Sequence, residues 1–326
     1  MRMEVAVAPV PHIHDGPHKV PPHGSLAWLS AHATTNLPFP TKLDSMSEKI
    51  AVITGTSSGI GLLSAIELAK AGFTVVASMR DLARRDRLDQ AAVAAAVTTQ
   101  LDVRRLNVAE FDTIPRFIDA VVRDHGRIDV LVNNAGFAVA GFAEDMKLDE
   151  IRLQFETNFF GHVAITQATL PTMRRQRSGH IIMVSSISGL HGALSISSYS
   201  ASKFALEGWS ESLRLEANAL GIKVVLVEPG SFQTDIWTRN AHLGEKTLDG
   251  SSPNRDRGQR MRDQVQKLKK RDPIEVARKI AKIAQDPNPR LRYVIGPDAH
   301  MQLWLKRLLP WRWHEKLLAR VLRIDG

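Results

Sequence analysis

Seven short apolar runs recur along the chain from Lys49 onward, and a longer segment with a helical period separates each from the next. The runs are KIAVITG (49–55), FTVVASM (73–79), AVTTQLDV (96–103), IDVLVNNAG (128–136), HIIMVSS (180–186), IKVVLVEPG (222–230) and RYVIG (292–296). Most are near-continuous stretches of Val, Ile and Leu, which is typical of strands buried on both faces. We therefore predict an α/β fold: a doubly wound parallel sheet of about seven strands, flanked by helices, in a single domain over residues 46–298.

Composition limits the classes of protein that this sequence fits. The chain of 326 residues is 44% hydrophobic and has no cysteine, so it can bury a large core, while disulfides and thiolate metal sites are excluded. The net charge of +9 favours anionic partners such as phosphates. Because the basic residues lack interleaved stacking aromatics, we predict no nucleic-acid partner.

Residues 1–45 differ in composition from the rest of the chain. They are rich in Pro and His and show no helical or strand period, so we predict a disordered extension. The segment lacks the basic start and apolar core of a secretory signal, and Met46 resembles a natural start. Its histidines fit a solvated tract better than metal ligands, and we predict no metal site.

A second unusual segment is the long polar insertion over residues 235–272. Polar insertions of this length after a core strand are usually either mobile lids or disordered loops. Because this one follows the strand next to the expected site, we predict a substrate lid.

The C-terminal segment, residues 299–326, is basic and amphipathic and carries three of the six tryptophans. No continuous run of 18 apolar residues occurs in the chain, so no transmembrane helix is expected. The segment could cover the substrate mouth, pack on a partner subunit or lie on a membrane surface. The helix break at Pro310 favours packing on the protein.

The stretch ITGTSSGIG joins the first predicted strand to the first predicted helix. Gly55, Gly59 and Gly61 allow a tight turn and a close backbone approach to a pyrophosphate, while the N-terminus of the helix offers free N–H groups. The position between a strand and a helix is the context that such a loop needs to bind a dinucleotide.

The stretch SYSASKF places Tyr199 four residues before Lys203 in a helical pattern. Side chains at this spacing lie on one face of a helix, so a phenol and an ammonium share one space. The pair could arise by accident in an amphipathic helix, or it could transfer protons.

Together these and other motifs resemble the short-chain dehydrogenase/reductase family over residues 49–235, in particular its hydroxysteroid and retinol branches. The motifs are Thr54-Gly55-x-x-x-Gly59-Ile60-Gly61, Asn133-Asn134-Ala135-Gly136, Asn158, Ser186, Tyr199-x-x-x-Lys203 and Pro229-Gly230-x-x-x-Thr234. The resemblance implies a Rossmann fold, a nicotinamide cofactor and interconversion of alcohols and carbonyl compounds.

The resemblance also assigns roles to individual residues. It implies a catalytic tetrad of Asn158, Ser186, Tyr199 and Lys203. The cofactor contacts that we predict are Gly55, Ser57, Ser58, Gly59, Ile60, Gly61, Arg80, Asp102, Val103, Asn133, Ala135, Gly136, Tyr199, Lys203, Pro229, Gly230 and Thr234.

The chemistry expected of these residues is a proton transfer that accompanies hydride transfer by the cofactor. A cation beside a phenol favours the phenolate, so we expect Lys203 to lower the pKa of Tyr199. Ser186 would hydrogen-bond the substrate oxygen, and Asn158 would hold a water that relays protons. The alternative is an inactive dinucleotide-binding regulator, although such a protein would be expected to lose the tyrosine or the lysine.

The end of the second predicted strand indicates which cofactor is used. Met79 stands where NAD-selective members of the family carry aspartate, and Arg80 can bind the 2′-phosphate of NADP. We therefore expect NADP(H) to be preferred over NAD(H). The alternative is that Arg80 and the arginines after it only cover a solvated turn, while Asp81 binds a ribose.

Apolar residues flank the expected site and predict an apolar alcohol or carbonyl substrate. They are Phe137, Phe142, Leu190, Leu194, Ile236 and Trp237. We further expect a cytoplasmic homo-oligomer, a dimer or a tetramer, whose membrane contact is limited to the C-terminal segment.

Overall fold

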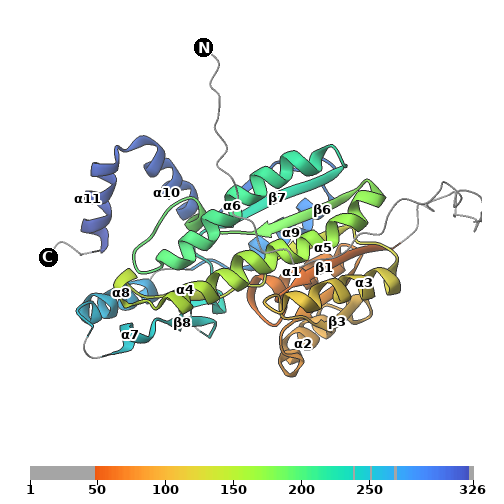
Figure 1. The fold of residues 1–326 in the computed structure, drawn as a ribbon, viewed down its shortest axis with the longest axis horizontal. Coiled ribbons are helices and arrows are strands. Elements are labelled where there is room, and N and C mark those ends of the chain that lie inside the picture. Colours follow the sequence, from red (N-terminus) through yellow and green to blue (C-terminus); the bar gives the residue numbers. More distant parts are fainter. Residues whose placement is uncertain (1–47, 238, 250–251, 268–269, 323–326) are drawn as a thin grey trace, which may run out of the picture. The chain divides into compact units, whose positions relative to one another are not determined.

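The computed structural model describes residues 48–237, 239–249, 252–267 and 270–322. The extension predicted over residues 1–45 lies outside this part of the chain. The described residues belong to one compact unit, and Figure 1 shows its central sheet with helices on both faces. No helix within them is long and apolar enough to cross a membrane.

Seven parallel strands form the main sheet, in the order β3-β2-β1-β4-β6-β7-β9. The predicted doubly wound fold is therefore confirmed, and the strand order reverses between β1 and β4. The strands are β1 (Lys49–Thr54), β2 (Phe73–Met79), β3 (Leu101–Arg105), β4 (Val130–Asn133), β6 (Gly179–Val184), β7 (Ile222–Pro229) and β9 (Arg292–Ile295).

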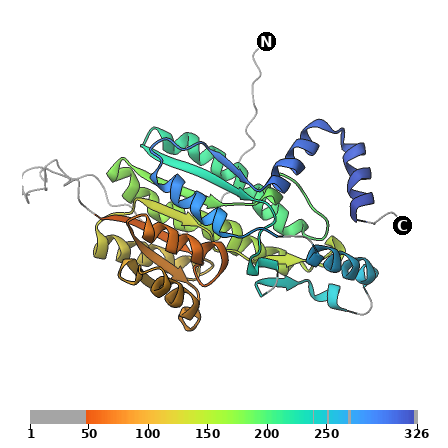
Figure 2. The same ribbon diagram turned by 180° about the vertical axis from the view of Figure 1, so that it is seen from behind.

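Helices cover the sheet because its strands are apolar on both faces. One buried cluster joins the sheet to α1, α2 and α9, and a second joins its other face to α3, α5 and α6. Figure 2 shows α1 and α9 from the side opposite to Figure 1. The helices around the sheet are α1 (Gly59–Lys70), α2 (Asp86–Ala94), α3 (Ile114–His125), α4 (Leu148–Phe155), α5 (Gly161–Gln176), α6 (Ser197–Asn218) and α9 (Ile274–Gln285).

Two predicted strand boundaries are wrong. The run 96–103 does not begin as a strand, because Ala96 has a φ of 54° and residues Thr98–Gln100 form a 3₁₀ turn before β3. The run 128–136 forms a strand only over Val130–Asn133. The residues after Asn133 leave the sheet because they bind the end of β1 instead, as described below.

The segment predicted as a lid, residues 235–272, contains several short elements. A 3₁₀ turn, η7 (Asp235–Trp237), leads to β8 (Ala241–Leu243), α7 (Glu245–Leu248) and α8 (Arg255–Lys267). Strand β8 pairs in parallel with β5 (Ala138–Ala140), which follows β4. This two-stranded sheet attaches the segment to the chain that leaves the main sheet.

The C-terminal segment forms two helices, α10 (Pro297–Leu308) and α11 (Trp311–Leu322). Pro310 lies between them, as the predicted helix break requires. The remaining short helical elements are η1 (Leu82–Arg84), η2 (Thr98–Gln100), η3 (Phe111–Thr113), η4 (Ala143–Asp145), η5 (Glu156–Phe160) and η6 (Ile187–Gly189).

A buried ionic cluster ties β9 to β7 and α6. Arg292 of β9 contacts the carboxylates of Glu207 and Glu211 on α6 and of Glu228 on β7. Burial raises the pKa of Glu228 to about 7, and it also raises the pKa of Glu207. The guanidinium of Arg292 therefore compensates carboxylates that have little access to water.

We expect Arg292→Met to lower the free energy of unfolding by about 3 kcal/mol at pH 8, because it leaves buried carboxylates without their cation. At pH 5 the carboxyl of Glu228 is protonated in the folded protein and does not need a cation, whereas above its pKa of about 7 it is ionised, so the loss should be larger at pH 8 than at pH 5. Urea unfolding at pH 5 and pH 8 measures it, with Arg290→Met as the exposed control. Equal losses at both pH values would contradict this assignment.

Candidate active site

The predicted site residues gather at the carboxyl ends of the central strands. The glycine loop follows β1, Asn134–Gly136 follow β4, Ser186 follows β6 and Gly230 follows β7. In a doubly wound sheet, ligands bind where the strand order reverses, and here that point lies between β1 and β4.

The glycine loop adopts a conformation that requires its glycines. Gly55 has a φ of +74°, and a Cβ there would lie 2.8 Å from the Cα of Ala135. A Cβ on Gly61 would lie 2.2 Å from the carbonyl oxygen of Gly55. Helix α1 begins at Gly59, so its free N–H groups and the loop meet at one place. This arrangement fits the pyrophosphate of a dinucleotide.

Thr54 and Asn134 hold this loop in position, and we did not predict either role. The hydroxyl of Thr54 accepts hydrogen bonds from the N–H groups of Asn134 and Ala135, at 3.0 and 2.9 Å. The amide of Asn134 donates to the carbonyl oxygens of Thr54 and Gly55, at 2.9 and 3.1 Å. These bonds join the ends of β1 and β4.

Asn133, which we predicted as a cofactor contact, points elsewhere. Its side chain is fully buried and donates to the hydroxyl of Thr166 on α5, at 2.8 Å. The strand alternates its side chains between the two faces, so neighbouring asparagines face in different directions. The sequence shows two asparagines in a row, and it contains no signal that indicates which of them faces the glycine loop.

Asp102 and Val103 are also misplaced in our prediction. Asp102 pairs with Val76 in the middle of β3, three residues before its end, or roughly 10 Å from the carboxyl edge. Its carboxylate is held by Arg104 and His125, and the latter lies 2.9 Å away. The chain that reaches the carboxyl edge after β3 is residues 106–108, whose first N–H bonds the end of β2.

The proton-transfer residues lie on two neighbouring elements. Tyr199 and Lys203 project from α6, and both are only 4% exposed. Ser186, at the end of β6, forms a side-chain hydrogen bond with Tyr199. The ammonium of Lys203 lies 5.8 Å from the centre of the Tyr199 ring and donates to the carbonyl oxygen of Val184, at 2.8 Å. The spacing of SYSASKF therefore does place the phenol and the ammonium in one space.

Burial changes the acidity of both groups. It raises the pKa of Tyr199 to about 12, although the hydrogen bond with Ser186 opposes this. It lowers the pKa of Lys203 to about 8, and the nearby Glu207 opposes that shift. Our expectation that Lys203 lowers the pKa of Tyr199 is thus wrong for the protein groups alone, because the desolvation of the phenol outweighs the distant cation.

Asn158 lies in the π-helix η5, which interrupts the regular path between α4 and α5. Such π-turns frequently occur at functional sites. Its side chain accepts a hydrogen bond from the N–H of Phe137, at 3.2 Å, and donates to the carbonyl oxygen of Phe137, at 3.0 Å. Asn158 therefore fixes the chain directly after the Asn134–Gly136 turn.

His162 supports the same turn and was not predicted. It is fully buried and hydrogen-bonds the carbonyl oxygen of Ala135 through its Nε2, at 2.7 Å. Burial, aided by the charge of Lys203, lowers the pKa of His162 to about 3. The imidazole is therefore neutral and donates this hydrogen bond.

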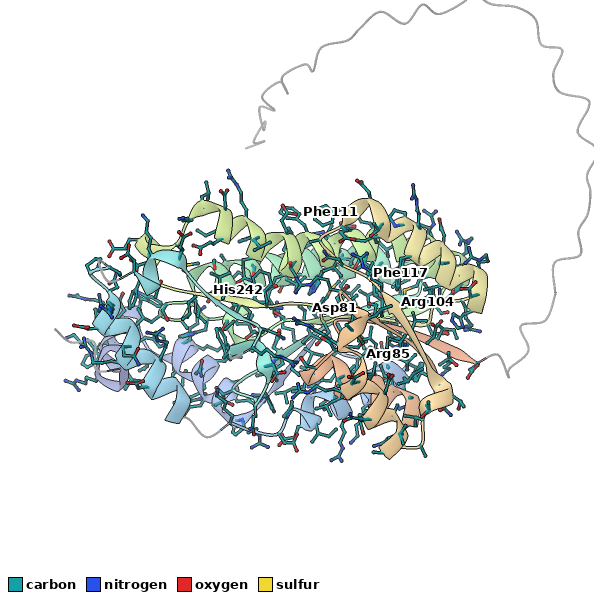
Figure 3. All side chains as sticks on the ribbon, turned by 90° about the horizontal axis from the view of Figure 1, so that it is seen from below. Asp81, Arg85, Arg104, Phe111, Phe117 and His242 are labelled. Atoms are coloured by element: carbon teal, nitrogen blue, oxygen red, sulfur yellow. The ribbon has the colours of Figure 1, made fainter. Side chains whose placement is uncertain are left out.

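Aromatic contacts connect the predicted lid to the site. The ring of Trp237 lies edge-on to Tyr199 at 5.3 Å, and His242 contacts Phe137 at 5.2 Å. Figure 3 shows His242 well separated from Arg104, which holds Asp102. Two residues of the predicted lid, Trp237 and His242, therefore contact residues of the site.

Three other residues that we predicted as cofactor contacts lie in different surroundings. Thr234 lies beside the glycine loop, 3.7 Å from where a Cβ on Gly59 would stand. Gly230 allows the carboxylate of Asp298 to approach, since a Cβ there would lie 2.6 Å from its oxygens. Arg80 directly follows β2 and is exposed. Within the described residues, no group of three or more His, Asp and Glu is arranged to hold a metal ion.

Comparison with known proteins gives consistent matches. The model of the short chain dehydrogenase family matches residues 49–243. The uncharacterized oxidoreductase YusZ of Bacillus subtilis is 40% identical over 280 residues, which are 85% of this chain and 99% of that protein. Human retinol dehydrogenase 8 is 42% identical over 188 residues, 57% of this chain and 59% of its own. A 3-ketodihydrosphingosine reductase of Bacteroides thetaiotaomicron is 35% identical over 257 residues, 77% of this chain and 89% of its own.

Solved structures of short-chain dehydrogenases have the same fold as this chain. A short-chain dehydrogenase from Streptomyces avermitilis superposes with a TM-score of 0.72 at 33% identity, covering 86% of this chain and all of that one. A metagenomic short-chain oxidoreductase in complex with NADP gives a TM-score of 0.60 at 26% identity, covering 76% of this chain and 96% of that one.

The buried ammonium of Lys203 predicts a pH-dependent effect on stability. Between pH 8 and pH 10.5 the unfolded chain binds more protons at this lysine than the folded protein, so wild-type stability gains as the pH rises, and the desolvation penalty is complete below pH 8. Lys203→Met removes this penalty. We expect the stability of the variant relative to the wild type to be highest near pH 7 and to fall by up to about 1.4 kcal/mol per pH unit above pH 8.

Urea unfolding at pH 7, 8.5 and 9.5 measures this difference. Lys282→Met, on the exposed side of α9, is the matched control. If the difference for Lys203→Met does not vary with pH more than that of the control, the lysine is not desolvated as the structure shows.

Proposed function

This chain belongs to the short-chain dehydrogenase family, and from that premise we propose that it interconverts an apolar secondary alcohol and its ketone, or an alcohol and its aldehyde, with NADP(H). Family membership already makes it an NAD(P)-dependent oxidoreductase. The observation that carries the finer proposal is the buried group of Tyr199, Ser186 and Lys203 beside the glycine loop.

The proton in this reaction belongs to the hydroxyl of Tyr199. The nicotinamide supplies or accepts the hydride when it is bound, so the protein has to orient the substrate and move one proton. Since burial keeps the phenol protonated at neutral pH, Tyr199 donates to the carbonyl oxygen during reduction. Ser186, which hydrogen-bonds Tyr199, would bind the same oxygen.

Lys203 and Asn158 act as supports in this scheme. Lys203 is held by the carbonyl oxygen of Val184 and places a positive charge near the phenol. Asn158 keeps the turn after β4 in place through its two hydrogen bonds with the backbone of Phe137.

An apolar substrate is supported by the groups that face Tyr199. Trp237 packs against the phenol, and Phe137, which is bonded to Asn158, packs edge-on against His242. The names of two relatives, a retinol dehydrogenase and a ketodihydrosphingosine reductase, refer to apolar substrates with a hydroxyl or a carbonyl group. Both support a lipid-like substrate for this chain.

The preference for NADP(H) is supported by the end of β2. Met79 is buried and provides no carboxylate at the strand end, and Arg80 follows it in an exposed position. Among the described residues, no carboxylate forms an ion pair with Arg80, whereas the neighbouring Asp81 accepts the N–H of Ala83 and contacts Arg84. The free guanidinium suits a 2′-phosphate.

Self-association is supported by an exposed apolar face on α4 and η5. Leu148, Leu153 and Phe160 are large apolar side chains that remain exposed there. We propose that this face is where subunits of a homo-oligomer meet.

Tyr199→Phe should reduce turnover by about 10²–10⁴-fold while leaving the affinity for NADPH unchanged, because only the proton donor is lost. Reduction of retinoid, steroid and long-chain ketones, followed by nicotinamide absorbance, measures the first effect, and titration with NADPH measures the second. The other tyrosine of the chain, in Tyr293→Phe, is the matched control. A Tyr199→Phe enzyme with more than half of the wild-type rate would refute the assignment.

Arg80→Ala should weaken NADPH binding by about 10–100-fold and leave NADH binding unchanged, because a charged hydrogen bond to the 2′-phosphate is lost. Arg84→Ala, at an exposed arginine five residues after the end of β2, is the matched control. Titration with NADPH and with NADH measures the affinity of each variant for both cofactors. An equal loss for NADH and NADPH would mean that the arginine is structural.

A further inference from the structure

The outer side of α10 carries a stripe of large apolar side chains. Met301, Trp304 and Leu308 are 58%, 62% and 57% exposed. They are spaced three and four residues apart, so they line one face of the helix. Soluble monomers rarely leave such a continuous apolar stripe in water.

Helix α11 extends this surface. Trp311 and Trp313 are 58% and 65% exposed, and Leu317 lies one turn after Trp313. Figures 1 and 2 both show α10 and α11 joined by a sharp bend. We call the exposed residues Met301, Trp304, Leu308, Trp311, Trp313 and Leu317 the tail surface.

Within the described part of the chain, cations without acidic partners accompany the tail surface, and the ammonium of Lys316 lies 5.8 Å from the ring centre of Trp313. Between Pro297 and Leu322 the sequence has five lysines and arginines and only two carboxylates. Among the described residues, none of the carboxylates forms an ion pair with the four exposed cations Arg307, Arg312, Lys316 and Arg320. On the catalytic body, by contrast, many exposed arginines of the turns and helices form an ion pair with a carboxylate.

The inner side of the same helices is attached to the loop that follows Ser186. Lys306 donates to the carbonyl oxygen of Leu190, and its ammonium lies 5.5 Å from the ring of Phe204 on α6. His314 is buried and packs edge-on against His191, with ring centres 5.1 Å apart. The tail surface is therefore held next to the catalytic loop by one side of each helix, and its apolar side faces outward.

We propose that the tail surface docks on a bilayer that contains anionic lipids. Tryptophan and long apolar side chains insert at the level of the headgroups, and unpaired cations beside them attract anionic phosphates. A second copy of this chain fits the surface less well. A twofold contact would bring the four unpaired cations of one copy against those of the other.

This docking has a consequence for the reaction. The helices that would lie in the interface are also those bonded to Leu190 and packed on His191, so the catalytic loop would sit beside the bilayer. An apolar substrate could then reach the site from the lipid phase instead of crossing water. This consequence rests on the function proposed above, whereas the docking itself does not.

The test is sedimentation of the full chain with vesicles of phosphatidylcholine, with and without phosphatidylglycerol, in the absence of substrate and cofactor. We expect binding to the anionic vesicles only, weakened by salt and accompanied by a blue shift of tryptophan fluorescence. Since no turnover is measured, failure of the proposed function would not alter the result.

Two variants locate the contact. Trp304→Ser with Trp313→Ser should weaken binding by about tenfold or more, through loss of inserted apolar area. Arg307→Glu with Lys316→Glu should weaken it by at least about fivefold for each cation removed. The controls are Leu215→Ser, at a residue 82% exposed on α6, and Lys282→Glu on α9. Circular dichroism and thermal unfolding without vesicles confirm that each variant is folded.

Three results would overturn the proposal. The first is that the wild-type chain does not sediment with the anionic vesicles. The second is that both paired variants bind as the controls do. The third is that these variants dissociate an oligomer in analytical ultracentrifugation, which would make the tail surface a contact between copies of the chain.

Discussion

The hydrogen bonds between the ends of β1 and β4 are the interaction on which the site depends. Thr54 accepts the N–H groups of Asn134 and Ala135, and Asn134 donates back to the carbonyl oxygens of the glycine loop. These bonds hold the two strand ends together, and Gly55 can approach Ala135 closely because it has no Cβ. On the other side, the turn after β4 is supported by α5 and the π-helix before it. The position for a dinucleotide and the floor of the substrate site are thus parts of one hydrogen-bonded turn.

Burial of polar groups is the second constraint, and it explains how the proton-transfer residues are organised. Tyr199 and Lys203 are almost completely removed from water, which disfavours the charged form of each. The ammonium remains in place because it donates to Val184 and lies near Glu207. Glu207 is in turn compensated by Arg292 from β9. The charge beside the phenol is therefore maintained by contacts that reach across the sheet to its last strand.

The C-terminal helices differ from the catalytic body in how their apolar and cationic side chains are buried and paired. On the body, apolar side chains enter two clusters beneath the helices and many exposed arginines have acidic partners. On α10 and α11 both apolar and cationic side chains remain exposed, although the inner sides of these helices are attached to the catalytic loop. Our expectation that this segment packs on the protein describes only the inner side. The outer side has the chemistry of a membrane surface.

Features that depend on local periodicity could be predicted from the sequence alone. Continuous apolar runs determined the seven buried strands, and the i, i+4 spacing placed Tyr199 and Lys203 on one helix face, because backbone geometry converts such spacings directly into direction. Only the tertiary structure decided that Asn134 and not Asn133 serves the glycine loop, that Asp102 lies in mid-strand, and that the pKa of Tyr199 rises. Each of these depends on the register between strands or on the exclusion of water by residues far apart in the sequence. No local pattern carries that information.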